Sequence, residues 1–275
     1  MNASDTKGLP IGVFDSGVGG LTVLKAIREA LPNENLVYLG DTARLPYGTK
    51  SPASISRYAC QATTHLQQNN IKLLVVACNT ASAVALEALR EQMHPLPVIG
   101  VVEPGAHAAI QARPGGRHLV LATEATVRLG AYRAALLDRD AAATVTELAC
   151  ELLVSLAEEG WNYGAIAESI VRRYLAELDE PARHPDSVIL GCTHFPLLRD
   201  TFTAVFDAGV SIVDSASTTA AAASELLGDA DLLNEQAGKG SLRLLATDGV
   251  TRFARVGGQF LGHDLNAQDI VLTDL

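Results

Sequence analysis

Short apolar runs alternate along most of the 275-residue chain with stretches in which apolar residues recur at helical spacing. Runs of four to six Val, Leu and Ile residues are typical of strands buried on both faces, as in a parallel sheet covered by helices. The alternation of strand and helix therefore predicts an α/β fold. We expect two similar doubly wound domains with mainly parallel sheets that face each other, and ligands bound beyond the carboxyl ends of the strands.

The pattern also predicts the individual elements. In the first part of the chain we expect strands at 11–14, 36–39, just before Cys78 and at 98–101, and helices at 21–31, 52–69 and 82–92. Further on, the predicted strands are 119–122, 144–148, the run before Cys192, 211–213, 242–246 and an edge strand at 270–273. The helices expected there start near 126, cover 151–159 and 163–178, and follow residues 213 and 248, with surface loops at 113–117 and 179–185.

Pro104 and Gly105 interrupt the pattern directly after Glu103, which suggests that the chain crosses there into a second domain. We expect the chain to return to the first domain near residue 214. The predicted first domain then comprises residues 1–103 and 214–275, and the second comprises 104–213.

Composition and charge limit the partners and the cellular location that we expect. Hydrophobic residues make up 48% of the chain, and the formal net charge is −10. Nucleic acids and anionic membranes bind basic patches, so neither is an expected partner. The polar start MNASDTKGLP lacks a signal-peptide core, and no apolar run reaches 18 residues. Four cysteines without CxxC spacing fit a reducing compartment, so a cytoplasmic protein is expected.

Two of the cysteines directly follow apolar runs. Cys78 lies in LLVVACNTASA and Cys192 in SVILGCTHFPLL. Ligands of parallel sheets bind beyond the carboxyl ends of the strands, and a helix start there favours a thiolate or a bound carboxylate. A free cysteine is often only a small buried hydrophobe. The polar residues that follow both cysteines nevertheless favour a chemical role.

The glycine-rich segment DSGVGG follows the first predicted strand. Its glycines, Gly17, Gly19 and Gly20, do not form the GxGxxG pattern of dinucleotide sites, and the segment has no GK[ST] of a phosphate-binding loop. A tight turn explains the glycines but leaves Asp15 and Ser16 unexplained. An acid at a strand end is a candidate to handle a proton or to hold an ammonium group.

Cys192 and His194 are two positions apart, a spacing at which an imidazole can assist a thiol. A metal site needs three or four ligands, and the clusters that supply them are missing from the sequence, so no metal is expected. A single covalent nucleophile would leave one strand-end cysteine without a role. Two thiols on opposite walls of a crevice instead suit the removal of a proton from carbon and its return to the opposite face.

Six motifs point in the same direction: FDSGVGGLTVL, YLGDTARLPYG, VVACNTASA, GVVEPGA, GCTHFPLL and VDSA. Together, and in this order, they closely resemble the glutamate racemases of the aspartate/glutamate racemase family. The resemblance implies a cofactor-independent isomerase that interconverts L- and D-glutamate and supplies D-glutamate for peptidoglycan in the cell wall. It also implies two α/β domains with the active site between them and a homodimer.

The resemblance assigns roles by matching positions. Cys78 and Cys192 would be the two catalytic acid/bases, with Asp15 and His194 as their respective partners. The implied substrate-binding residues are Asp15, Ser16, Pro46, Tyr47, Gly48, Asn79, Thr80, Thr123, Thr126, Glu158 and Thr193. Near Glu158 the chain has CELLVSLAE where the family usually has CPxFVPLVE, so the resemblance leaves the role of Glu158 and the shape of that wall open.

Two alternatives stay open at this point. A related two-cysteine racemase could act on aspartate, a hydantoin or another small acid, because the proton-transfer residues do not specify side-chain length. A non-catalytic α/β protein could bind an amino acid without exchanging its α-proton, and would leave both cysteines idle.

Overall fold

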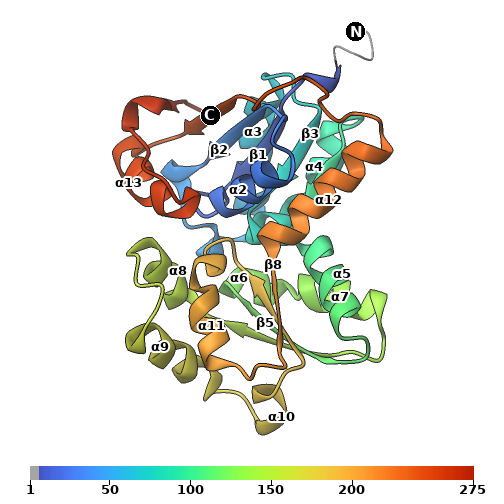
Figure 1. Ribbon diagram of the computed structural model, residues 1–275, viewed down its shortest axis with the longest axis vertical. Coiled ribbons are helices and arrows are strands. Elements are labelled where there is room, and N and C mark those ends of the chain that lie inside the picture. The colour runs from blue at the N-terminus through green and yellow to red at the C-terminus, as the bar shows by residue number, and fades with distance from the viewer. Residues whose placement is uncertain (1–5) are drawn as a thin grey trace.

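The computed structural model describes residues 6–275 and contains two parallel sheets, one in the upper and one in the lower part of Figure 1. The six-stranded sheet has the order β10-β9-β2-β1-β3-β4, and the four-stranded sheet has the order β6-β5-β7-β8. The first sheet consists of β1 (Ile11–Asp15), β2 (Leu36–Gly40), β3 (Leu73–Val76), β4 (Val98–Gly100), β9 (Leu242–Ala246) and β10 (Ile270–Leu272). The second consists of β5 (Arg117–Ala122), β6 (Thr144–Ala149), β7 (Ser187–Gly191) and β8 (Ser211–Asp214).

Helices cover both faces of each sheet. On the first sheet, α2 (Leu21–Ala30), α12 (Ser215–Asp229) and α13 (Val250–Leu261) pack on one face, and α3 (Pro52–Gln67) and α4 (Asn79–Met93) on the other. On the second sheet, α8 (Glu151–Glu158), α9 (Ala165–Leu175) and α11 (Arg199–Val205) pack on one face, and α5 (Val102–Ala112) and α7 (Ala131–Arg139) on the other. This double cover explains the continuous apolar runs, and the predicted fold class is confirmed.

We call the six-stranded sheet with its helices the first lobe, and the four-stranded sheet with its helices the second lobe. Strands from residues 11–100 and 242–272 form the first sheet, and strands from residues 117–214 form the second. The chain passes between the lobes near α5 and again where β8 leads into α12 (Figure 1). Domain boundaries near residues 103 and 214 remain our proposal.

The pairing of neighbouring strands places several predicted site residues at the carboxyl edges of the two sheets. In the first sheet Phe14 pairs with Val76, so Asp15 and the residues after β3 lie at the same carboxyl edge. In the second sheet Ala122 pairs with Gly191, which places Thr123 beside the residue after β7. The polar segments that follow these strands therefore meet between the two lobes.

Several sequence-based boundaries were wrong. The segment from Glu103 to Gly105 does not interrupt the chain, because α5 runs through it; Pro104 lies in the first helical turn, where its missing N–H is tolerated. Helix α4 begins at Asn79 and not at residue 82, because Cys78 itself caps the helix. The helix expected from residue 126 is two helices, α6 (Glu124–Leu129) and α7, separated by Gly130 at φ +62°.

Smaller differences concern the surface. The loop expected at 179–185 contains the one-turn helix α10 (Glu180–Arg183), and Arg117 opens β5 instead of closing a loop. Between residues 6 and 275, no helix is long and apolar enough to cross a membrane. Over the same residues, His, Cys, Asp and Glu side chains form no group of three or more that could hold a metal ion.

Candidate active site

Cys78 lies where β3 ends and α4 begins. Its Sγ accepts a hydrogen bond from the Ala81 N–H at 3.4 Å, and its thiol donates to Ser16 Oγ at 3.5 Å. Burial, followed by the negative charge of Asp15, raises the pKa of Cys78 to about 12. The Ala81 N–H at the helix start does favour the thiolate, but desolvation outweighs it.

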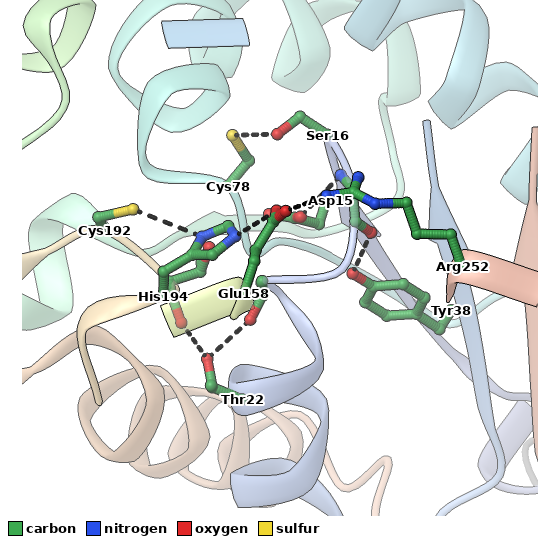
Figure 2. Close-up of polar contacts among 12 residues, drawn as sticks. Asp15, Ser16, Thr22, Tyr38, Cys78, Glu158, Cys192, His194 and Arg252 are labelled. Atoms are coloured by element: carbon green, nitrogen blue, oxygen red, sulfur yellow. Dashed lines mark hydrogen bonds and ion pairs between the residues drawn. The ribbon is translucent and has the colours of Figure 1, made fainter. Parts of the chain in front are cut away.

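Cys192 lies after β7 and belongs to a chain of polar contacts (Figure 2). Its Sγ is 3.7 Å from His194 Nδ1, and the other ring nitrogen of His194 is 3.2 Å from Glu158 Oε1. Arg252 donates to the second oxygen of Glu158 at 2.6 Å. Thiol, imidazole, carboxylate and guanidinium thus follow one another in a line.

Neighbouring groups in this line shift each other's pKa toward the charged form. Burial disfavours the imidazolium, but the contacts with Cys192 and Glu158 outweigh it and raise the pKa of His194 to about 10. The hydrogen bond from His194 in turn lowers the pKa of Glu158. His194 is therefore a cation at neutral pH, and a cation beside a sulfur atom stabilises the thiolate form.

Asp15 ends β1 and is almost completely buried. One carboxylate oxygen accepts the Gly17 N–H at 2.8 Å, while the other, Oδ1, has no hydrogen-bond partner among residues 6–275. Burial raises the pKa of Asp15, although the charge of His194 opposes this. Asp15 is close enough to influence Cys78 by its charge, but no direct hydrogen bond joins them in the described part of the chain.

A cavity of about 50 Å³ lies between the two cysteines' segments. Eleven of the fourteen predicted site residues line it: Ser16, Pro46, Tyr47, Gly48, Cys78, Asn79, Thr80, Thr123, Cys192, Thr193 and His194. Asp15, Thr126 and Glu158 lie behind its wall, and the site roles of all fourteen residues remain proposals. A larger hollow of about 690 Å³, lined mainly by α5 and α12, contains neither cysteine.

Three hydroxyl groups join the lobes beside the cavity. Thr80 Oγ1 lies 2.9 Å from Thr123 Oγ1 and 3.3 Å from Thr126 Oγ1, and the last two are 3.0 Å apart. Nearby, Tyr132 donates to Asn79 Oδ1 at 2.7 Å. Thr126 therefore positions the other two hydroxyls without reaching the cavity.

The sequence pattern missed other members of the site. Glu151 and Val154 on α8 also line the cavity, and Tyr38 holds the DSGVGG turn by donating to the Gly17 carbonyl at 2.8 Å. Glu151 follows the strand β6 closely, so the strand-end rule that identified both cysteines would have identified it as well. Arg252 gives no local signal, since it is half exposed on a distant helix.

Comparisons with known proteins settle the family. The Asp/Glu/Hydantoin racemase family matches residues 11–223. The chain belongs to this family. It is 47% identical over 255 residues, 93% of either chain, to the glutamate racemase of Geobacter metallireducens. The predicted resemblance, and with it the assignment to the isomerases, is confirmed.

Solved structures agree with this membership. The glutamate racemase of Francisella tularensis in complex with D-glutamate superposes with a TM-score of 0.89 at 34% identity, over 98% of both chains. The glutamate racemase of Thermus thermophilus in complex with β-chloro-D-alanine gives a TM-score of 0.87 at 40% identity, again over 98% of both. The family fold thus extends over nearly the whole chain.

Proposed function

We propose that this protein interconverts L- and D-glutamate without a cofactor, by two-base proton transfer between Cys78 and Cys192. The observation that carries the proposal is that these cysteines, from the strand ends of two different sheets, line one small cavity. Relatives that match over more than nine-tenths of the chain are glutamate racemases, which supports the choice of substrate.

The two thiols are prepared for different tasks. Cys78, with a pKa of about 12, stays a protonated thiol at neutral pH and can donate a proton. Cys192 is paired with the His194 cation, so it is the side that can hold a thiolate. In one direction the Cys192 thiolate takes the α-proton from one face of the substrate, and the Cys78 thiol gives its proton to the other face. The opposite direction uses the reverse distribution of protons.

The remaining lining groups would stabilise charge at the substrate carboxylates. An α-proton of an amino acid is weakly acidic, so the negative charge that develops on the carboxylate needs fixed donors. Hydroxyls of Ser16, Thr80, Thr123 and Thr193 and the amide of Asn79 line the cavity, and His194 is its one cationic lining residue within 6–275. The small volume excludes most water, which strengthens these contacts.

We extend the proposal to the cell. A glutamate racemase would supply D-glutamate for peptidoglycan synthesis, and we propose that the protein works in the cytoplasm as a homodimer with L- and D-glutamate as its small-molecule partners. The net charge of −10 supports the expectation that nucleic acid and anionic membrane surfaces are not partners.

The decisive experiment follows the α-proton of L-glutamate in D₂O by NMR, with optical rotation measured in parallel. The expected result is loss of the α-proton signal while the rotation decays toward zero. Cys78→Ser and Cys192→Ser should each abolish racemisation, with Cys60→Ser as the matched control that keeps it. Full activity in either active-site variant would disprove the two-cysteine mechanism.

The same assay separates the alternatives. The family description also names aspartate and hydantoin racemases, so aspartate and a hydantoin are tested in parallel. If one of these exchanges and glutamate does not, the two-cysteine chemistry survives and the substrate assignment fails. Tight binding of glutamate with no exchange would favour a non-catalytic binding protein.

A further inference from the structure

We infer that Arg252 is a positioning residue of the active site: it fixes the carboxylate of Glu158 so that Glu158 holds the imidazolium of His194 against Cys192. Arg252 lies on α13 of the first lobe, whereas Glu158 and Cys192 belong to the second lobe. The inference rests on the proposed function, and it means that helix α13 of the first lobe helps to position the active site of that function.

The geometry of Glu158 supports this role. Its two oxygens face different partners, with Oε1 at 3.2 Å from His194 Nε2 and Oε2 at 2.6 Å from Arg252 Nη2 (Figure 2). The side chains of Glu158 and His194 are 16% and 12% exposed, and that of Arg252 is 52% exposed. Arg252 is therefore the member of this line that lies nearest to solvent. It donates to the Glu158 oxygen that would otherwise bind water.

Helix α13 also contacts His194 directly. The ring of Phe260 meets the imidazole edge to face, with centroids 5.2 Å apart. The charged and titratable groups that act on His194 are Cys192 on its own loop, Glu158 on α8 and Asp15 at the end of β1, with Arg252 behind Glu158. One helix of the first lobe thus supplies both an apolar support for the ring and the anchor of its carboxylate partner.

A positioning role and a simple charge effect predict opposite results. If Arg252 acted only as a nearby cation, its removal would make the imidazolium more stable and would raise the pKa of His194. If Arg252 positions Glu158, its removal frees the carboxylate, weakens the bond to Nε2 and lowers the pKa of His194. The direction of the change therefore decides between the two.

The experiment uses Arg252→Met, which keeps a long apolar side chain but loses charge and donors, and Arg252→Lys, which keeps the charge. Arg255→Met is the matched control, since Arg255 is an exposed arginine on the same helix. The side-chain ¹⁵N resonances of His194 are titrated between pH 7 and 11 without substrate, with the His194→Gln spectrum to assign them. Then kcat and KM for both glutamate enantiomers are measured over the same pH range.

For Arg252→Met we expect the His194 pKa and the alkaline limb of kcat to move down by about one pH unit, a tenfold change in the protonation equilibrium. KM should stay within about twofold, and Arg252→Lys should restore at least half of the shift. An unchanged or raised His194 pKa, or an equal shift in Arg255→Met, would overturn the inference. Absence of glutamate exchange in the unmodified protein would instead defeat the proposed function, while the titration still tests Arg252.

Discussion

The hydroxyl of Thr22 reaches across the two lobes to the backbone carbonyl of Thr193, 2.9 Å away, and shares its proton with the Gly19 carbonyl at 3.0 Å (Figure 2). Thr22 lies at the start of α2 in the first lobe, and Thr193 directly follows Cys192 in the second. Both residues are buried. The loop that carries Cys192 and His194 is thereby tied to the helix that follows the DSGVGG turn, so the distance between the two cysteine segments depends on a contact that neither cysteine makes.

Thr22→Val should loosen this connection. The variant keeps the shape of the side chain but leaves the buried Thr193 carbonyl without its donor, which costs about 1–3 kcal/mol of unfolding free energy. Racemisation should also fall several-fold, because the two thiols must be held at a fixed separation. Urea unfolding and glutamate kinetics measure both effects. Thr22→Ser retains the hydroxyl and should behave almost like the unmodified protein; equal behaviour of Val and Ser would mean that the bond is irrelevant.

The two active-site thiols should differ in reactivity. Cys78 and Cys192 have the same exposed fraction, 5%, and line the same cavity, so access to a small reagent is similar for both. Only the thiolate reacts with iodoacetamide, and Cys78 stays protonated well above neutral pH. At pH 7.5 we expect Cys192 to be alkylated about fivefold or more faster than Cys78, as followed by peptide mass spectrometry over time.

His194→Asn tests the cause of that difference. Loss of the imidazolium should slow the alkylation of Cys192 and leave the rate of Cys78 nearly unchanged. Faster labelling of Cys78 in the unmodified protein would reverse the assignment of thiolate and thiol.

The ionised carboxylate of Asp15 should lower the free energy of unfolding of the protein. Its pKa in the folded state is raised above the ordinary value of 3.8, mainly by burial. A raised pKa contributes stability that is complete below about pH 3.8 and is lost as the pH rises through the folded-state pKa, so near pH 8 the buried charge is a cost.

Asp15→Asn removes that charge and keeps an oxygen to accept the Gly17 N–H. We expect the unfolding free energy at pH 8 to rise, because the variant no longer buries a charge. The advantage should shrink as the pH approaches 4, and racemisation should fall at least a hundredfold. Urea unfolding at several pH values checks the stability, and a variant less stable than the parent at pH 8 would show that the raised pKa is wrong.

The sequence was sufficient to propose the parts of the candidate site that lie next to strands. An apolar run shows where a buried strand ends, and parallel sheets collect ligands at that edge, so Asp15, Cys78 and Cys192 were proposed from the local pattern, and Thr123 from the family resemblance. The start of α4 was misplaced because its N-cap is Cys78, and cysteine is not among the usual N-cap residues.

Contacts between distant segments could not be found in this way. Arg252 and Glu158 are 94 positions apart and lie in different lobes, and each alone is an ordinary charged residue on a helix. The protonation of Cys78 also required the folded structure, because its pKa is raised by burial and by the charges of Asp15 and Cys192, which lie far from it in the sequence. Sequence motifs therefore led to the sulfur atoms that we propose to react, while the groups that set their charge required the folded chain.

A buried ion pair far from the cavity offers a test of stability that should leave the chemistry intact. Lys72 Nζ lies 2.6 Å from Glu34 Oε2, and both side chains are almost fully buried. The same ammonium donates to the Leu232 carbonyl at 2.8 Å, so it joins β3's start to the segment after α12. Lys72→Met should cost about 3–5 kcal/mol of unfolding free energy, because the Glu34 carboxylate is left buried without its partner.

The double variant Lys72→Met/Glu34→Gln should recover most of that loss, since glutamine removes the unpaired charge and still accepts the Asn234 N–H that Glu34 binds at 2.7 Å. Thermal and urea unfolding measure the energies, and kcat for glutamate, taken at a temperature where every variant is folded, should stay within about twofold of the parent because none of these residues lines the cavity. A loss of kcat in the folded double variant would show that the far end of the first sheet is coupled to Cys78 through β3, so that fold stability and site chemistry are not separate.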